Sequence, residues 1–118
     1  MAIKVEKPTE QQVVAMRQWP TWSKEPSSFD WEYDTAETCY LITGDVRVTS
    51  ENGDVVEFGE GDLVTFPAGL KCRWDVRRPV LKHYRMFDQH EEILFEQGIY
   101  EIRRQREWSP DGWRRVED

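Results

Sequence analysis

Seven short segments with β-strand character follow one another between residues 29 and 86, and they constrain the fold more than any other feature. Turns or short loops separate them, and the segments are residues 29–33, 37–42, 45–49, 54–58, 62–66, 71–76 and 80–86. The sharpest turn signal is Asn52-Gly53, because this dipeptide readily adopts the positive φ angles of a tight hairpin. Closely spaced short strands predict an all-β antiparallel sandwich or barrel.

The segment FDWEYDTAETCYLITG, residues 29–44, indicates which face of the first strands is buried. Phe29, Trp31 and Tyr33 alternate with acidic residues, so an extended backbone places three rings on one face and three carboxylates on the other. The next strand begins at Glu37, which lies on an otherwise apolar face, and we expect Thr43-Gly44-Asp45 to end that strand. Glu37 is therefore a carboxylate directed at the core, and it requires a partner.

The regions before and after these strands have a different pattern. Residues 1–28 are expected to form an arm, in which Thr9 to Gln12 form a capping box at the start of a helix over residues 10–18. Residues 88–118 are expected to form a C-terminal extension, with a helical turn at 90–97 and a strand at 98–103. At 118 residues the chain is expected to be one domain, residues 1–118, with its barrel at 29–87.

Charge and composition exclude several classes of partner. The net charge of −7 opposes attraction to phosphate backbones and to anionic lipid, so we expect neither nucleic acid nor a membrane as partner. The N-terminal residues lack the apolar stretch of a signal peptide, which predicts a cytoplasmic protein. The two cysteines, Cys39 and Cys72, are then expected to be reduced.

The spacing of residues at the joints between strands resembles the cupin superfamily. Six residues separate Glu37 from Gly44, four separate Gly61-Asp62 from Pro67-Ala68-Gly69, and Cys72 follows three positions later. More closely, the motifs W-P-x-W, F-x-W-x-Y, E-T-C-Y and G-D-L-V-x-F-P-x-G look like small single-domain cupins grouped with ureidoglycine aminohydrolase and the ethanolamine-utilisation cupins. This resemblance implies a jelly-roll (double-stranded β-helix) barrel.

The resemblance also implies a divalent metal, held by a His-x-His pair, a glutamate and a third histidine. In this sequence Trp31 and Tyr33 occupy the His-x-His positions, Cys72 occupies the third histidine position, and only Glu37 matches. Indole does not ligate divalent cations, and tyrosine ligates mainly trivalent iron. We therefore expect no metal cofactor; the alternative is a divalent metal held by Glu37, the Cys72 thiolate and a histidine.

Several side chains are candidates for a site inside the barrel. Lys82 shares its parity with Val80, Tyr84 and Met86, and an inward Lys82 would neutralise Glu37, bind an anionic ligand or act as an amine nucleophile. The predicted ligand-binding residues are Trp31, Tyr33, Glu37, Cys72, Trp74, Lys82 and Tyr84. The alternative for the aromatic members is that they fill the barrel and leave no cavity.

Two classes of function are compatible with this set. The first is a cupin that binds a small polar or aromatic molecule in an aromatic-lined cavity without catalysing a reaction. The second is an enzyme, either metal-assisted as in ureidoglycine aminohydrolase or metal-independent, with Glu37, Cys72 and Lys82 as candidate catalytic residues. The outward apolar residues Tyr40 and Ile42 predict a sheet-to-sheet or subunit interface, and we expect a homodimer.

Overall fold

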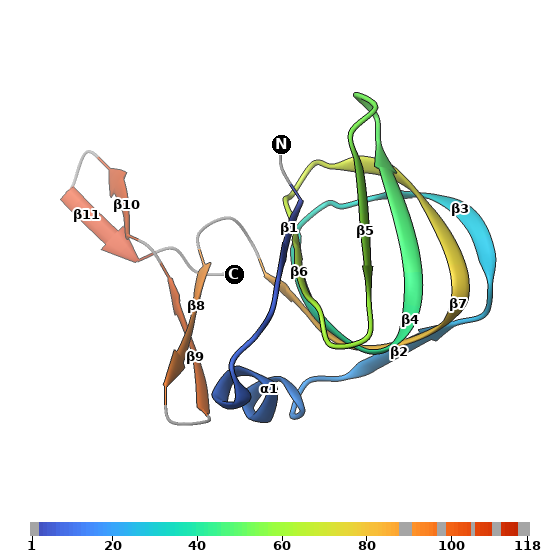
Figure 1. The fold of residues 1–118 in the computed structure, drawn as a ribbon. Helices are drawn as coiled ribbons and strands as arrows, with labels where there is room; N and C mark the ends of the chain where they lie inside the picture. Colours follow the sequence, from blue (N-terminus) through green and yellow to red (C-terminus); the bar gives the residue numbers. More distant parts are fainter. Residues whose placement is uncertain (1–2, 88–90, 97–98, 105, 110–111, 116–118) are drawn as a thin grey trace.

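The structure is a computed structural model that describes residues 3–87, 91–96, 99–104, 106–109 and 112–115. The described residues form antiparallel strands and one short helix near the N-terminus (Figure 1). In chain order the elements are β1 (Lys4–Glu6), α1 (Glu10–Met16), β2 (Thr21–Lys24), β3 (Ser27–Glu32), β4 (Ala36–Ser50), β5 (Val55–Gly59), β6 (Leu63–Phe66), β7 (Lys71–Phe87), β8 (Glu91–Glu96), β9 (Ile99–Arg104), β10 (Arg106–Ser109) and β11 (Gly112–Arg115). The predicted all-β class with an N-terminal helix is confirmed.

The two long strands β4 and β7 form the frame of the barrel. They pair antiparallel from Ala36 opposite Phe87 to Ser50 opposite Cys72, and both curve around the interior (Figure 1). Over one half of their length, β6 and β1 extend the sheet beyond β4, and β2 pairs with β7. Over the other half, β5 pairs with β4 and β3 pairs with β7. Each long strand therefore serves both halves of the barrel.

Two predicted interruptions of the chain are bends within continuous strands. The sequence pattern predicted that a strand ends at Thr43-Gly44-Asp45 and that residues 71–76 and 80–86 are separate strands, and the structure corrects both points. The pairing of β4 with β7 instead shifts register in three steps between Leu41 and Val46. Turn-forming residues mark a β-bulge here because a bulge, like a turn, needs unusual backbone angles, although the ladder continues on either side.

Gly44 is the residue that permits this bend. Its φ is +136°, a value that residues with a side chain rarely adopt, and a Cβ at this position would lie 3.0 Å from Val80 Cγ2. Pro79 lies in the same irregular region of β7, where its missing N–H does not interrupt a regular ladder. The Thr43 hydroxyl donates a hydrogen bond to the Pro79 carbonyl at 3.2 Å, which joins the two strands across the bend.

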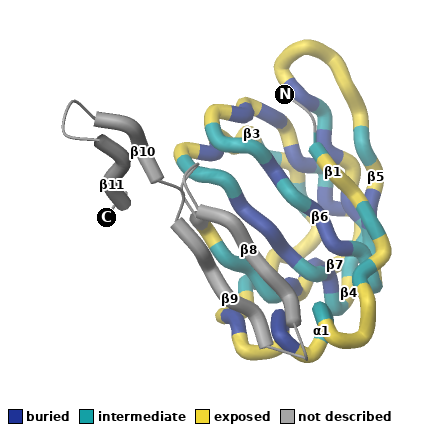
Figure 2. Tube along the Cα trace, turned by 90° about the vertical axis from the view of Figure 1, so that its left-hand side faces the viewer, coloured by how far each residue is buried: buried dark blue, intermediate teal, exposed yellow. Residues whose placement is uncertain are grey.

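The bulge also changes which positions of β4 face the interior. Before it the buried residues include the odd-numbered Glu37, Cys39 and Leu41, and after it they are the even-numbered Val46, Val48 and Ser50. In β7 the buried positions remain even-numbered, namely Cys72, Trp74, Val76, Val80 and Lys82. Figure 2 shows buried segments along the barrel strands in dark blue. Side chains from both halves of both strands therefore meet in one interior.

The N-terminal segment covers the outside of the sheet and also extends it. The predicted capping box is confirmed: Thr9 Oγ1 accepts a hydrogen bond from the Gln12 backbone N–H, and Gln12 Oε1 accepts one from the Thr9 N–H. The helix ends at Met16, two residues before the predicted end. Met16, Trp19 and Leu63 form a second apolar cluster against which Tyr40 packs. An element of the same chain thus covers Tyr40, and the homodimer stays a prediction.

Residues 1–28 and 88–118 contain more strands than the sequence pattern indicated. β1 pairs with β6 and β2 pairs with β7, so the segment assigned as an arm supplies two strands of the barrel sheet. The predicted helical turn at 90–97 is wrong, because residues 91–96 form β8, which pairs with β9. β10 pairs with β11 in a further two-stranded sheet. Among the described residues the single helix, α1, has seven residues and is far too short to span a bilayer.

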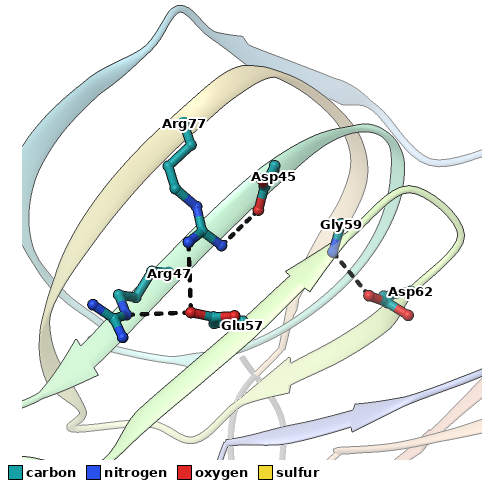
Figure 3. A network of polar contacts seen from close by, with 6 residues as sticks. All are labelled: Asp45, Arg47, Glu57, Gly59, Asp62 and Arg77. Atoms are coloured by element: carbon teal, nitrogen blue, oxygen red, sulfur yellow. Dashed lines mark hydrogen bonds and ion pairs between the residues drawn. The ribbon is translucent and has the colours of Figure 1, made fainter.

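A polar network on the outer surface joins β4, β5 and β7 (Figure 3). Arg77 Nη2 lies 2.7 Å from Asp45 Oδ1, and Glu57 Oε1 lies 3.5 Å from Arg77 Nη1 and 3.4 Å from Arg47 Nε. All four side chains are substantially exposed, and exposed ion pairs each stabilise a fold by about 0–1 kcal/mol. This network supports the sheet from outside and lies apart from the interior.

Candidate functional site: an aromatic cavity in the barrel

A cavity of about 330 Å³ opens into the barrel interior. It is lined by Trp22, Phe29, Trp31, Tyr33, Glu37, Trp74, Lys82, Tyr84 and Met86. Glu37 and Lys82 are buried and form its floor, Tyr33 and Trp74 are buried in its wall, and Trp31 is 47% exposed and lies at its mouth. The cavity therefore combines a buried base containing two charged groups with an accessible aromatic rim.

Aromatic rings fill the part of the barrel beside this cavity. Tyr33 stacks on Phe66 with ring centroids 4.7 Å apart and an interplanar angle of 8°. Phe58 packs edge to face against Phe66 and Trp74, at 5.9 and 5.6 Å. These are the favoured geometries for aromatic pairs, so the rings form a solid wall. The alternative that the aromatic residues fill the barrel and leave no cavity is therefore not met, because a cavity stays open next to these rings.

The wall of the cavity is built from cross-strand pairs on the inner face. Phe29 of β3 lies opposite Trp74 of β7, and their rings stack at 6.0 Å with an angle of 15°. Trp22 of β2 lies opposite Lys82 of β7 and packs edge to face against Trp74 at 6.1 Å. Opposed residues of neighbouring strands are close enough for their side chains to interact, which positions these rings without any loop.

Glu37 and Lys82 form an ion pair at the cavity floor. Lys82 Nζ lies 2.5 Å from Glu37 Oε2, and the two residues are only 5% and 4% exposed. The same ammonium lies over the rings of Trp22 and Trp74, 4.9 Å from each centroid. Two indole faces and one carboxylate therefore compensate the charge of Lys82. Of the three roles that the sequence allowed for an inward Lys82, neutralisation of Glu37 is the one that this contact shows directly.

Three titratable groups of the barrel interior, Tyr33, Cys39 and Cys72, are held in their neutral forms. Burial raises the pKa of the Cys39 thiol to about 12; the Lys82 charge acts against this shift, and the nearby Glu37 adds to it. Burial also raises the pKa of Cys72 to about 11, and it raises the pKa of the Tyr33 hydroxyl well above its ordinary value. The Trp74 indole N–H acts in the opposite direction on Tyr33 and Cys72, with a smaller effect. Both thiols are free and protonated at neutral pH, so neither is an activated nucleophile.

These raised pKa values predict a loss of stability in alkali. Above pH 9 an unfolded thiol releases a proton that the folded protein retains, so the free energy of unfolding falls as pH rises toward 12. The slope is at most about 1.4 kcal/mol per pH unit for each buried group. Urea unfolding at pH 8.0 and 10.5 measures it, and the Cys39→Ala variant should show a smaller decrease. A free energy of unfolding that is unchanged over this range would contradict the burial of the thiols.

The structure places six of the seven predicted ligand-binding residues around the cavity. These are Trp31, Tyr33, Glu37, Trp74, Lys82 and Tyr84. Cys72 is the exception, because it lines a separate open groove with Asp30, Lys71 and Arg73. Trp31 borders both spaces. The Cys72 side chain belongs to the buried core cluster, but it lies nearer the other end of β7 than Lys82 does.

The sequence interpretation missed three lining residues, Trp22, Phe29 and Met86. The alternation that selected Trp31 and Tyr33 applies equally to Phe29, and the parity of Lys82 applies to Met86, so a signal existed for both. No such signal existed for Trp22. Its four-residue strand follows a proline and lies in the N-terminal segment that the sequence pattern assigned to an arm. Only its pairing with β7 brings it to the cavity.

The residues at the expected cupin metal position do not fit a metal ion. Lys82 Nζ lies 2.5 Å from the one retained ligand, Glu37, where it supplies a positive charge from the chain itself. Trp31 offers an indole, Tyr33 a protonated hydroxyl, and Cys72 a protonated thiol in a different groove. His83 is engaged elsewhere, with Nδ1 2.9 Å from the Trp19 carbonyl oxygen, and His90 is outside the described residues.

Within the described part of the chain, no group of three or more histidine, cysteine or acidic side chains has the arrangement needed to hold a metal. The alternative ligand set of Glu37, Cys72 thiolate and a histidine is therefore not assembled by these residues. The chemistry of the floor is that of a carboxylate and an ammonium in an aromatic enclosure.

Comparison with known proteins places this architecture in a family. Residues 12–84 match the model of the EutQ-like cupin domain. A crystal structure of a DUF861 family protein from Thermotoga maritima is 52% identical, with a TM-score of 0.71, and the match covers 73% of this chain and 100% of that one. A DUF861 family protein from Pseudomonas syringae pv. tomato is 28% identical, with a TM-score of 0.52 over 57% of this chain and 29% of that one.

The EutQ protein of Clostridium difficile has the same fold, with a TM-score of 0.53 at 24% identity over 58% of this chain and 53% of that one. No match was found among curated proteins. The range matched by the family model includes eight of the nine cavity-lining residues, all except Met86. The chain therefore belongs to the EutQ-like cupin domain family, and its barrel is a cupin fold.

Proposed function

We propose that this protein binds a small molecule with a flat ring inside its barrel. The observation that carries the proposal is the cavity of about 330 Å³, which has aromatic walls and a single buried ion pair at its floor. Ligand sites typically measure about 300–1,000 Å³ and combine apolar walls with a few polar groups. An apolar cavity of about 150 Å³ already admits benzene, so this space suits one ring or a small fused pair.

The walls determine how such a ring would be held. Phe29 and Trp74 present nearly parallel ring planes, whereas Trp22 and Trp31 stand at steep angles to their neighbours. A flat ligand entering past Trp31 meets faces and edges of rings on several sides, which is the arrangement that aromatic pairs favour. The Glu37–Lys82 pair then faces the end of the ligand that enters first.

A metal-independent enzyme using the same floor is the second candidate function. The observation that favours it is the 2.5 Å contact between a proton donor, Lys82 Nζ, and a proton acceptor, Glu37 Oε2, at the end of an accessible cavity. The Cys72 thiol is not favoured as a participant, because it lies outside the cavity and its pKa is raised. Incubation with each bound compound, followed by mass spectrometry, distinguishes turnover from binding alone.

Ligand binding is tested with Trp31→Ala, which removes the exposed ring at the mouth. Screening of single-ring aromatic compounds by NMR should identify binders that shift the indole resonances of Trp22 and Trp74. Because an aromatic pair contributes about 0.5–1.5 kcal/mol, Trp31→Ala should weaken these binders roughly 2- to 10-fold.

The matched control is Arg77→Ala, which lies in the outer polar network and should leave binding unchanged. If no compound in the screen shifts an indole of the cavity wall, or if both variants weaken binding equally, the cavity is not the binding site.

A further inference from the structure

We infer that the ligand presents a neutral amide-type edge to the cavity floor, with a hydrogen-bond donor beside an acceptor. The inference rests on the proposed binding function and names the chemical class that the same site selects. At the floor of the cavity, the buried charged groups Glu37 and Lys82 are paired with each other. Their charges sum to zero, so the floor as a whole is polar but uncharged.

This neutrality disfavours charged ligands. A carboxylate that approached Lys82 would also approach Glu37, because Nζ and Oε2 are only 2.5 Å apart. An ammonium that approached Glu37 would meet Lys82 for the same reason. Either ligand would leave one net charge in a space enclosed by aromatic rings, where an uncompensated charge is strongly unfavourable. The two indole faces around Lys82 already stabilise one cation there.

The pair retains hydrogen-bonding capacity on both members. An ammonium donates three hydrogen bonds and a carboxylate accepts up to about four. The Lys82–Glu37 bond uses one of each, and an interaction of the Cys39 thiol with Glu37 uses at most one more acceptor position. A ligand can therefore accept from Lys82 and donate to Glu37 at the same time.

The spacing of the two groups matches an amide edge. In a cyclic amide with N–H and C=O on the same side, bond lengths place the nitrogen and oxygen roughly 2.2 Å apart. Lys82 Nζ and Glu37 Oε2 lie 2.5 Å apart, so two nearly parallel hydrogen bonds form without separating the ion pair. A planar lactam satisfies both the floor and the aromatic walls.

The test compares four probes that share a six-membered ring: 2-pyridone, benzoate, benzylammonium and toluene. Dissociation constants are measured by NMR titration at pH 7 and constant ionic strength. The expected result is that 2-pyridone binds at least 10-fold more tightly than each of the other three. The amide class would be overturned if benzoate or benzylammonium bound more tightly than 2-pyridone, or if toluene bound as tightly as 2-pyridone. Each of these three outcomes would leave the proposed binding function standing.

Failure of every probe, including toluene, to reach the cavity would instead remove the proposed function and this inference with it. The double variant Glu37→Met/Lys82→Met tests the recognition directly, since it removes both polar groups and keeps the side-chain volume similar. It should abolish the preference for 2-pyridone over toluene while retaining toluene binding. The control Arg73→Met, in the exposed pair with Asp30, should retain the full preference. An unchanged preference in the double variant would place recognition elsewhere.

Discussion

Replacement of Lys82 with methionine should lower the free energy of unfolding by about 3–5 kcal/mol, the loss typical when one member of a buried ion pair is removed. The physical reason is that Glu37, which is 4% exposed, would remain in an aromatic interior without its partner. The variant also loses the contact of the ammonium with the faces of Trp22 and Trp74. Urea unfolding followed by circular dichroism measures the change.

The double variant Glu37→Met/Lys82→Met distinguishes the stability loss caused by an unpaired buried charge from the loss caused by a packing defect. Exchange of a buried ion pair for apolar residues of similar volume is often neutral or stabilising, so the double variant should be more stable than Lys82→Met alone. As an exposed counterpart, Arg73→Met breaks the Asp30–Arg73 pair and should change stability by about 0–1 kcal/mol. If Lys82→Met and Arg73→Met lowered the free energy of unfolding by equally small amounts, the Glu37–Lys82 pair would be solvated rather than buried.

The second large effect is expected from Trp74→Ala, which should lower the free energy of unfolding by about 3–5 kcal/mol. Trp74 is 2% exposed and its ring contacts four other aromatic rings, those of Trp22, Phe29, Phe58 and Phe66. Removal of the indole joins the space it occupied to the existing cavity, and the contacts with these four rings are lost. Circular dichroism is again the suitable probe, since the substitution removes a fluorophore.

Trp31→Ala is the matched control for this substitution. Both residues are tryptophans that line the cavity, but Trp31 is 47% exposed and lies at the mouth. Its removal should change stability by about 1 kcal/mol or less, as for other substitutions away from the core. Equal losses of the free energy of unfolding in the two variants would show that Trp31 is as tightly packed as Trp74.

Much of the site followed from local alternation along the strands. Side chains two apart on a strand share a face, so the sequence correctly grouped Trp31 with Tyr33 and Lys82 with Tyr84. The requirement that a buried carboxylate be compensated then made Lys82 a candidate partner for Glu37, although 45 positions separate the two residues. Cys72 was assigned to the same site because it stands at the third histidine position of the cupin pattern, but this match does not specify which space its side chain borders, and it lines a different groove.

The points that local alternation did not predict depend on contacts between distant segments. Gly44 produces a bulge rather than a turn because β7 continues to pair with β4 on both sides of it. Trp22 reaches the cavity because β2 pairs with β7 opposite Lys82, and no local pattern in its segment indicates that partner. In both cases the outcome is set by hydrogen bonding to a strand far along the chain.

The sequence by itself determined most of the strands between residues 29 and 87 and their inward faces, and it identified Lys82 as a candidate partner for Glu37, because these follow from a period of two residues and from the unfavourable burial of an unpaired charge. Only the tertiary structure decided that part of the barrel is filled and part is open. That division depends on how Tyr33, Phe58, Phe66 and Trp74, brought together from four strands or loops, stack on one another. Ring packing is a property of the assembled interior, and no single segment specifies it.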